Sequence, residues 1–130
     1  MPTLPWSTPN TPSPGAEVHV FASRFETRTL GGALVFLART PGVWRQVLRA
    51  PGAHGATLKA EVFKRTFWTL SAWESAEALK EFARSGTHAP TSRKLAPRMR
   101  DAAYASWTTS ADQLPVDWDE ARRRLASAQR

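Results

Sequence analysis

The order of two hydrophobic patterns along the chain constrains its fold more than any other feature. Apolar residues at every second position are typical of strands, and a spacing of three to four residues is typical of helices. Between residues 17 and 110 these patterns follow one another as strand, helix, strand, strand, helix, strand. Two right-handed βαβ crossovers in one sheet place both helices on the same face. We therefore predict an α+β domain with a ferredoxin-like βαββαβ layout and an antiparallel sheet.

Local signals support the expected elements. Ser75 is a good N-cap, and Glu77 favours the positive end of a helix dipole, so a helix is expected to begin there. Pro41 interrupts the first helical pattern, which predicts either one kinked helix or two short ones. The expected strands are 18–29, 56–62, 66–73 and 102–109, and the expected helices are 33–50 and 75–84.

Two segments flank this domain. Residues 1–16 are rich in proline, which has no amide hydrogen to donate, so we expect an extended arm that does not join a sheet. Trp6 in this arm either docks into a groove of its own subunit or a partner, or belongs to a disordered tail. Residues 111–130 are expected to form a polar extension with a short helix at 119–126.

The third expected strand has two different faces. The apolar set consists of Trp68, Leu70 and Ala72. The mixed set combines aromatic and hydroxyl side chains and consists of Phe67, Thr69, Ser71 and Trp73. We expect the apolar set to contact the helices and the mixed set to line a pocket between sheets. Because the face without helices carries aromatic residues rather than charges, we expect a second subunit to cover it.

Composition excludes several classes of protein. The hydrophobic share is 42% and the charged share 22%, which are ordinary values for a globular domain. There is no cysteine, which excludes disulfides and thiolate metal sites and fits a cytoplasmic location. No run of about 18 apolar residues exists, so neither a membrane span nor a membrane partner is expected. The common motifs for nucleotide binding, serine hydrolysis and zinc hydrolysis are absent.

The net charge of +7 raises the question of nucleic acid. Much of the excess lies at residues 122–124 and 84–100, and neither run alternates cations with aromatic stacking residues as single-strand binders do. A solvated basic surface is therefore the preferred interpretation, and a nucleic-acid partner is not expected.

His88 is the candidate catalytic residue. It follows the second expected helix in the stretch Ser85-Gly86-Thr87-His88, where an imidazole is able to act as a general base near neutral pH, donate a hydrogen bond or ligate iron. The alternative is a ring that only closes the loop through backbone hydrogen bonds. No metal site is predicted from the spacing of the histidines.

Four further residues are candidates for substrate binding. Arg24 lies in a strand, where a cation either anchors an anionic substrate or reaches solvent past the sheet edge. Trp68, Trp73 and Trp107 offer rigid apolar surface to a flat organic ligand, and the alternative is that they are core residues.

The stretch TFWTLSAWESAEALKEF, which begins at Thr66 and continues to Ser85-Gly86-Thr87-His88, resembles the strand-to-helix segment of the antibiotic biosynthesis monooxygenase-like proteins. These form the dimeric α+β barrel superfamily, and the resemblance is closest to its small bacterial branch. The order of elements from Val18 to Thr109 agrees with that family as well.

The resemblance implies a homodimer whose two sheets face one another, with a pocket in each subunit between the sheet and the neighbouring helices or loops. Family members include cofactor-independent oxygenases of polyphenols, haem-degrading enzymes and haem-binding proteins. Trp73 and His88 fall where the family motif places them, and His88 is then the candidate acid/base or ligand. The residues themselves predict no cofactor, and haem is the one that the resemblance allows.

The leading hypothesis is an enzyme that oxidises or rearranges a flat hydrophobic metabolite, with His88 as the base. The alternatives are a protein that binds haem or a pigment without catalysis, and a structural dimer whose tryptophans fill their own pocket.

Overall fold

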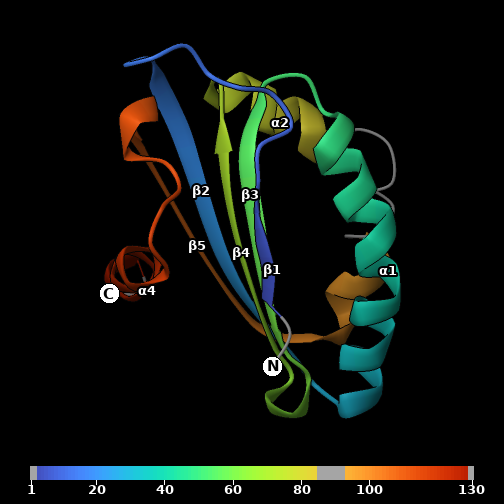
Figure 1. The fold of residues 1–130 in the computed structure, drawn as a ribbon. Coiled ribbons are helices and arrows are strands. Elements are labelled where there is room, and N and C mark those ends of the chain that lie inside the picture. The colour runs from blue at the N-terminus through green and yellow to red at the C-terminus, as the bar shows by residue number, and fades with distance from the viewer. Residues whose placement is uncertain (1–2, 85–92, 129–130) are drawn as a thin grey trace.

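The computed structural model describes residues 3–84 and 93–128. Within them, one antiparallel sheet has the strand order β1-β3-β4-β2-β5, and Figure 1 shows α1 and α2 on one face and α4 on the other. The ferredoxin-like α+β architecture is therefore confirmed. The elements are β1 (Thr3–Ser7), β2 (Glu17–Thr27), α1 (Leu30–Arg49), β3 (Ala53–Glu61), η1 (Val62–Lys64), β4 (Thr66–Trp73), α2 (Ala76–Arg84), η2 (Ala96–Arg98), β5 (Met99–Ser110), η3 (Ala111–Gln113) and α4 (Trp118–Ala128).

Both helices of the helix layer begin at a capping side chain. The Thr29 hydroxyl accepts a hydrogen bond from the Gly32 amide at 2.9 Å, and the Ser75 hydroxyl accepts one from the Ala78 amide at 3.1 Å. α1 continues through Pro41 as one helix, so the prediction of two short helices is excluded.

The proline-rich arm differs from the prediction, because part of it is a strand. β1 pairs antiparallel with β3, and it lies at the edge of the sheet. An edge strand needs amide donors on one side only, so the proline at position 5 is tolerated there. Beyond β1, the Asn10 side-chain amide donates to the carbonyl oxygens of Ala50 and Ala53, each at 3.0 Å, and attaches the rest of the arm.

The two faces of β4 are reversed relative to the prediction. The mixed set contacts the helix layer: Trp73 is 1% exposed with its ring 5.1 Å from that of Phe82 on α2, and the Phe67 ring is 4.3 Å from that of Phe36 on α1. The side chains that α1 and α2 present toward the sheet include large aromatic rings. These rings pack on the aromatic members of the mixed set.

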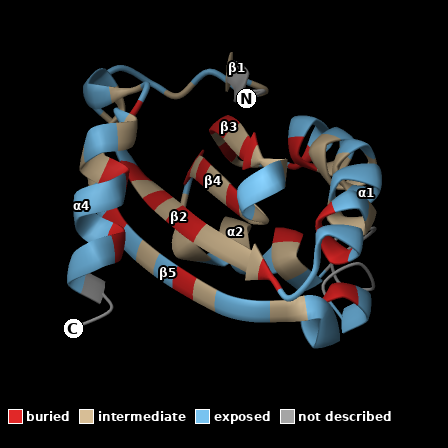
Figure 2. Cartoon of the chain, turned by 90° about the horizontal axis from the view of Figure 1, so that it is seen from below, coloured by how far each residue is buried: buried red, intermediate tan, exposed pale blue. Residues whose placement is uncertain are grey.

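The opposite face is covered in part by the chain itself. Ala121 and Leu125 of α4 pack in one cluster with Leu70 and Trp107, and Trp6 of β1 packs against the same cluster. In Figure 2, α4 crosses beside β2 and β5, with its buried residues toward the sheet. We expected a second subunit to cover this face. Over this part of the sheet that expectation is wrong, because α4 covers it.

Candidate functional site

The sheet divides the predicted substrate-binding residues between its two faces. Arg24 is paired with Trp68 in the β2–β4 register, and Trp107 is paired with Val20, so these side chains share the face toward α4. Trp73 lies on the face toward α1 and α2. His88 lies outside the described residues. The predicted set therefore does not form one site.

Arg24 and Trp68 belong to a polar network near the end of the sheet where β2 and β3 end. The Arg24 Nη2 atom donates to Asp101 Oδ2 at 2.9 Å, and its guanidinium lies 6.0 Å from the centroid of the Trp68 ring. The Trp68 indole donates to Glu61 Oε1 at 2.8 Å. The Arg24 cation therefore has a carboxylate partner within the protein, and its predicted role as a substrate anchor stays a prediction.

The pKa values of the two carboxyls in this network are lowered. The hydrogen bond from Arg24 is the main reason that the pKa of Asp101 is below its usual value. The hydrogen bond from the Trp68 indole is the main reason that the pKa of Glu61 is low, with a further contribution from Lys64. Both carboxylates are therefore held in the ionised form, which suits ion pairing rather than proton transfer.

Trp107 is a core residue of the α4 face. Its ring is 9% exposed, and the guanidinium of Arg124 on α4 lies 4.5 Å from its centroid. α4 thus covers the surface that was predicted to contact a ligand.

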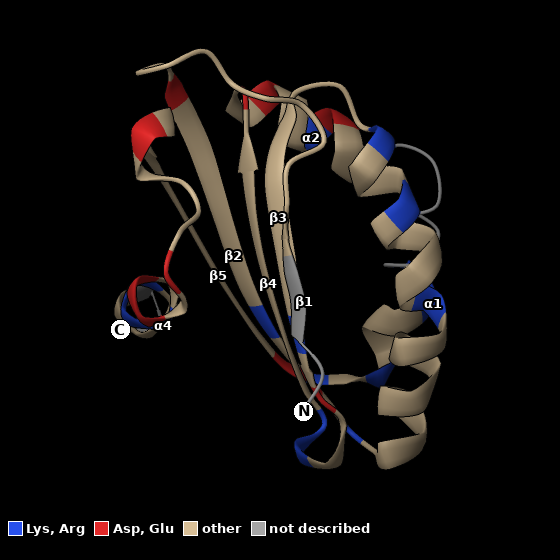
Figure 3. Ribbon diagram, viewed as in Figure 1, with Lys and Arg blue, Asp and Glu red and all other residues tan. Residues whose placement is uncertain are grey.

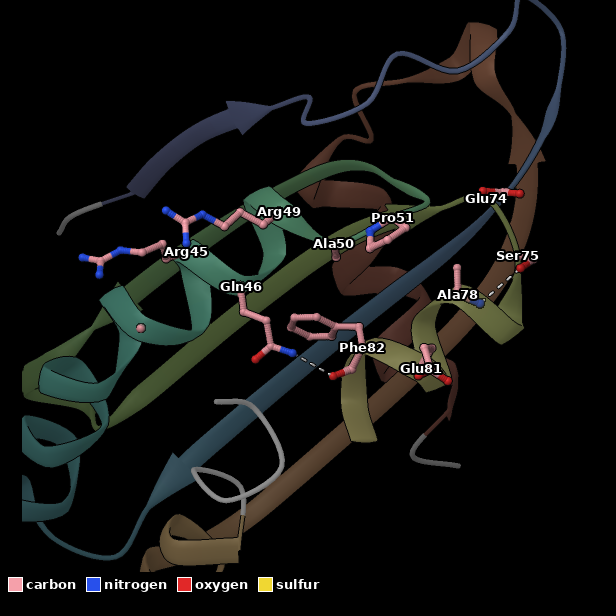
Figure 4. A pocket seen from close by; sticks show the side chains of 11 residues that line it. Arg45, Gln46, Arg49, Ala50, Pro51, Glu74, Ser75, Ala78, Glu81 and Phe82 are labelled. Carbon is pink, nitrogen blue, oxygen red and sulfur yellow. Dashed lines mark hydrogen bonds between the residues drawn. The ribbon is translucent and has the colours of Figure 1, made fainter. Parts of the chain in front are cut away.

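A cavity of about 610 Å³ lies between α1 and α2. Figure 4 shows the side chains around it, which come from the C-terminal half of α1, the turn that follows it, the turn before α2, and α2 itself. Its lining residues are Gly42, Arg45, Gln46, Arg49, Ala50, Pro51, Glu74, Ser75, Ala78, Glu81 and Phe82.

An aromatic pair connects this cavity to the sheet. Phe82 lines the cavity and packs on Trp73, which is buried behind it. The Gln46 amide donates to the Phe82 carbonyl at 3.1 Å and joins α1 to α2 beside the opening. Gly52 has φ of +80°, and a Cβ atom there would lie 2.9 Å from the Ala78 Cβ, so only glycine allows α2 to approach this closely.

Hydroxyl side chains lie behind the aromatic pair on the same face of the sheet. The Trp73 indole donates to Ser71 Oγ at 2.8 Å, and the hydroxyls of Ser23 and Thr69 are hydrogen-bonded to each other. Beyond them Tyr104 is 52% exposed. The helix face of the sheet therefore carries hydroxyl groups, hydrogen-bonded within the protein, among aromatic rings.

Sequence reasoning placed Trp73 beside a pocket but did not find Phe82 or Gln46. Phe82 is the last large apolar residue of the amphipathic α2, a pattern that indicates burial and nothing more. Gln46 carries no signal in sequence, because its role comes from the approach of α1 to α2.

Among residues 3–84 and 93–128, no group of three or more metal-ligating side chains lies close enough to hold a metal ion. No helix of that part of the chain is long and apolar enough to cross a bilayer.

Comparison with solved structures shows the fold. A candidate antibiotic biosynthesis monooxygenase of Nitrosomonas europaea matches with a TM-score of 0.61 and 13% identity, over 75% of this chain and 92% of that one. A variant of SnoaB, a cofactor-independent oxygenase of Streptomyces nogalater, matches with a TM-score of 0.59 and 19% identity, over 76% and 97%. A candidate monooxygenase of Fusobacterium nucleatum matches with a TM-score of 0.66 and 5% identity, over 82% of this chain and 48% of that one.

No curated protein matches the chain in sequence. A family model, described as a domain of unknown function (DUF3291), matches residues 36–130. The chain therefore belongs to the DUF3291 family, and it has the fold of the antibiotic biosynthesis monooxygenase-like proteins.

Proposed function

We propose that this protein is an enzyme that oxidises or rearranges a flat hydrophobic metabolite at the cavity between α1 and α2. The observation that carries the proposal is this cavity of about 610 Å³, lined by Phe82, which packs on Trp73. Its volume lies within the range of small-molecule sites, roughly 300–1,000 Å³. A cofactor-independent oxygenase shares the fold, which adds support by analogy.

The chemistry requires an apolar site and one base. A base removes a proton from an activated CH₂ group, and the resulting carbanion passes an electron to O₂ and then combines with it as a peroxide. The protonated base gives its proton to the peroxide and is free again. It then removes the second C–H proton, and the O–O bond breaks to give a ketone and hydroxide. The hydroxide takes that proton back from the base, so the products are one ketone and one water.

His88 is the base in this proposal. It follows α2 in the sequence, and α2 carries Phe82 at the cavity. An imidazole is suited to this step because its ordinary pKa lies close to neutral pH.

The test is oxygen uptake with 1,8-dihydroxyanthrone and a panel of related anthrones and naphthols. His88→Ala is expected to lower kcat by about 10²–10⁴-fold. Gly42→Phe is expected to lower turnover, because the added ring would take up part of the cavity that Gly42 lines. Ala38→Phe, at an exposed position of the same helix, is the matched control and is expected to keep turnover.

Two results would contradict the proposal. One is turnover that is unchanged in both the His88→Ala and Gly42→Phe variants. The other is a folded wild-type protein, verified by circular dichroism, that oxidises no member of the panel.

We also propose that the active form is a homodimer. The face toward α4 supports this, because Trp68 and Trp6 are only partly buried beside the part that α4 covers. A second sheet laid over this region would bury both rings.

A further inference from the structure

We propose that α1 docks on an anionic lipid surface through a row of exposed leucines. Four leucines of α1 are exposed by 37–53%. Their positions fall within an arc of about 60° around the helix, and they extend over about 27 Å of its length. This leucine face consists of Leu30, Leu34, Leu37 and Leu48.

The leucine face belongs to an outer side of α1 that the fold leaves uncovered. Ala33 and Val47, on another side of the same helix, are buried against the sheet. Gly42 and Gln46 line the cavity on the side toward α2. The helix thus has one side on the sheet, one side at the cavity, and a third apolar side in solvent, which a water-exposed helix does not ordinarily carry.

The charged residues of α1 itself are all positive. The helix has no acidic residue, and Figure 3 shows basic but no acidic positions on it. Its cations are Arg39, Arg45 and Arg49, and Arg28 precedes it. Arginines beside an exposed apolar row complement anionic headgroups, while the leucines enter the boundary of the acyl chains.

A second exposed group lies at the N-terminal end of α1. Phe63, in the turn between β3 and β4, is 83% exposed, and Lys64 and Arg65 follow it. The Arg65 guanidinium donates to the Arg28 carbonyl at 3.4 Å, which holds this turn beside the start of α1. Figure 1 shows both segments at the same end of the molecule. A large exposed apolar ring, followed by two cations, is therefore available at the end of the leucine face.

A bilayer fits these observations better than a protein partner. None of the four leucines, nor Phe63, lines the cavity between α1 and α2, and all five side chains are exposed on a helix and a turn. A bilayer surface needs no matching hollow, whereas a protein partner does. A second copy of α1 would bring arginines together without an acid to pair them. Docking on a surface is distinct from spanning a bilayer, which α1 is not apolar enough to do.

The experiment is co-sedimentation of the full chain with vesicles of phosphatidylcholine alone, or with about one third phosphatidylglycerol, at about 0.1 M salt. We expect the protein to sediment with the anionic vesicles, and at least tenfold less with the neutral ones. Leu34→Ser/Leu37→Ser and Phe63→Ser are each expected to lower the partition coefficient at least fivefold.

The charge contribution has its own matched pair of variants. Arg45→Gln/Arg49→Gln removes two cations beside the leucine face and is expected to weaken anionic partitioning. Arg122→Gln/Arg123→Gln removes the same charge from α4, across the sheet, and is expected to have at most a twofold effect. Circular dichroism and thermal unfolding establish that each variant is folded.

Three outcomes would overturn the inference: no sedimentation of wild type with anionic vesicles, equal partitioning of the leucine variants and wild type, or equal losses in the two charge variants. A fourth outcome that would overturn the inference comes from sedimentation velocity. If the wild type is a dimer and the leucine variant is a monomer, the leucine face joins two copies of the chain.

Discussion

At Trp68 a single indole N–H influences the ionisation of a carboxylate on the neighbouring strand. The Nε1 atom donates to Glu61 at the end of β3, and the Glu61 carboxylate also lies 3.4 Å from Lys64 Nζ. Because the hydrogen bond favours the charged form, the folded-state pKa of Glu61 lies below its ordinary value of 4.5. Its contribution to stability is complete above that ordinary value and is lost as the pH falls through the lowered pKa.

This linkage predicts how Trp68→Phe behaves. Loss of the indole N–H is expected to lower the free energy of unfolding at neutral pH by about 1 kcal/mol, because a hydrogen bond to a charged group is removed. The difference between wild type and variant should narrow as the pH falls through the lowered pKa of Glu61, because the carboxyl then loses the charge that the hydrogen bond favours. Urea unfolding at a series of pH values from neutral into the acid range measures it. A difference that stays the same at every pH would contradict the assignment. Glu61→Gln is the control, because its side chain does not ionise.

At the scale of elements, β1 depends on a contact between Trp6 and Gly55. A Cβ atom built at Gly55 would overlap the Trp6 ring, so the indole lies directly on the backbone of β3. Trp6 also packs against the cluster that includes Leu70 and Val116. The missing side chain at position 55 is therefore the reason that the proline-rich arm is able to dock on the sheet.

Gly55→Ala is expected to displace Trp6 and lower the free energy of unfolding by about 1–3 kcal/mol, since the ring loses its place on the strand. The comparison is a double-mutant cycle with Trp6→Ala, measured by urea unfolding. Once the ring is absent, the added methyl group has nothing to displace and should cost little. If the changes in the free energy of unfolding of the two single variants simply add in the double variant, the two residues are not coupled.

At the scale of the whole molecule, assembly is the open prediction. Trp68 and Trp6 are partly buried on the face toward α4, and the Arg122 guanidinium of α4 lies 5.8 Å from the centroid of the Trp68 ring. A second chain is expected to bury both tryptophans further. Sedimentation velocity over a range of concentrations is expected to show a dimer. Trp68→Ala should weaken it at least tenfold, because aromatic residues near the centre of an interface dominate its affinity.

The matched control for assembly is Leu34→Ser, on the opposite side of the molecule, which should leave the dimer unchanged. A chain that stays monomeric at every concentration would contradict the homodimer. So would a dimer that survives Trp68→Ala and dissociates with Leu34→Ser.

The elements themselves were largely predictable. Strand β4 was expected at residues 66–73 and spans Thr66–Trp73, and α2 begins at the Ser75 cap. These features depend on local spacing and on single capping side chains, which are present in the sequence. The arm was predicted wrongly as an element outside the sheet, because its pairing depends on a glycine far along the chain.

The candidate site was predictable only in part. Trp73 was expected to line a pocket between sheets, but it is buried on the helix face behind Phe82, which lines the cavity in its place. Arg24 and Trp68 were grouped with it, but they lie across the sheet, where Arg24 is paired with Asp101. A list of aromatic and charged residues does not say which of them share a face with a helix.

The sequence alone determined the order and approximate limits of the strands and helices, since hydrophobic period and caps are local properties. Only the tertiary structure decided which face of β4 each helix covers, because both faces are apolar enough to be buried. The same holds for the cover that α4 provides and for the cavity between α1 and α2. Each of these depends on contacts between segments far apart in the chain, and local patterns contain no record of such contacts.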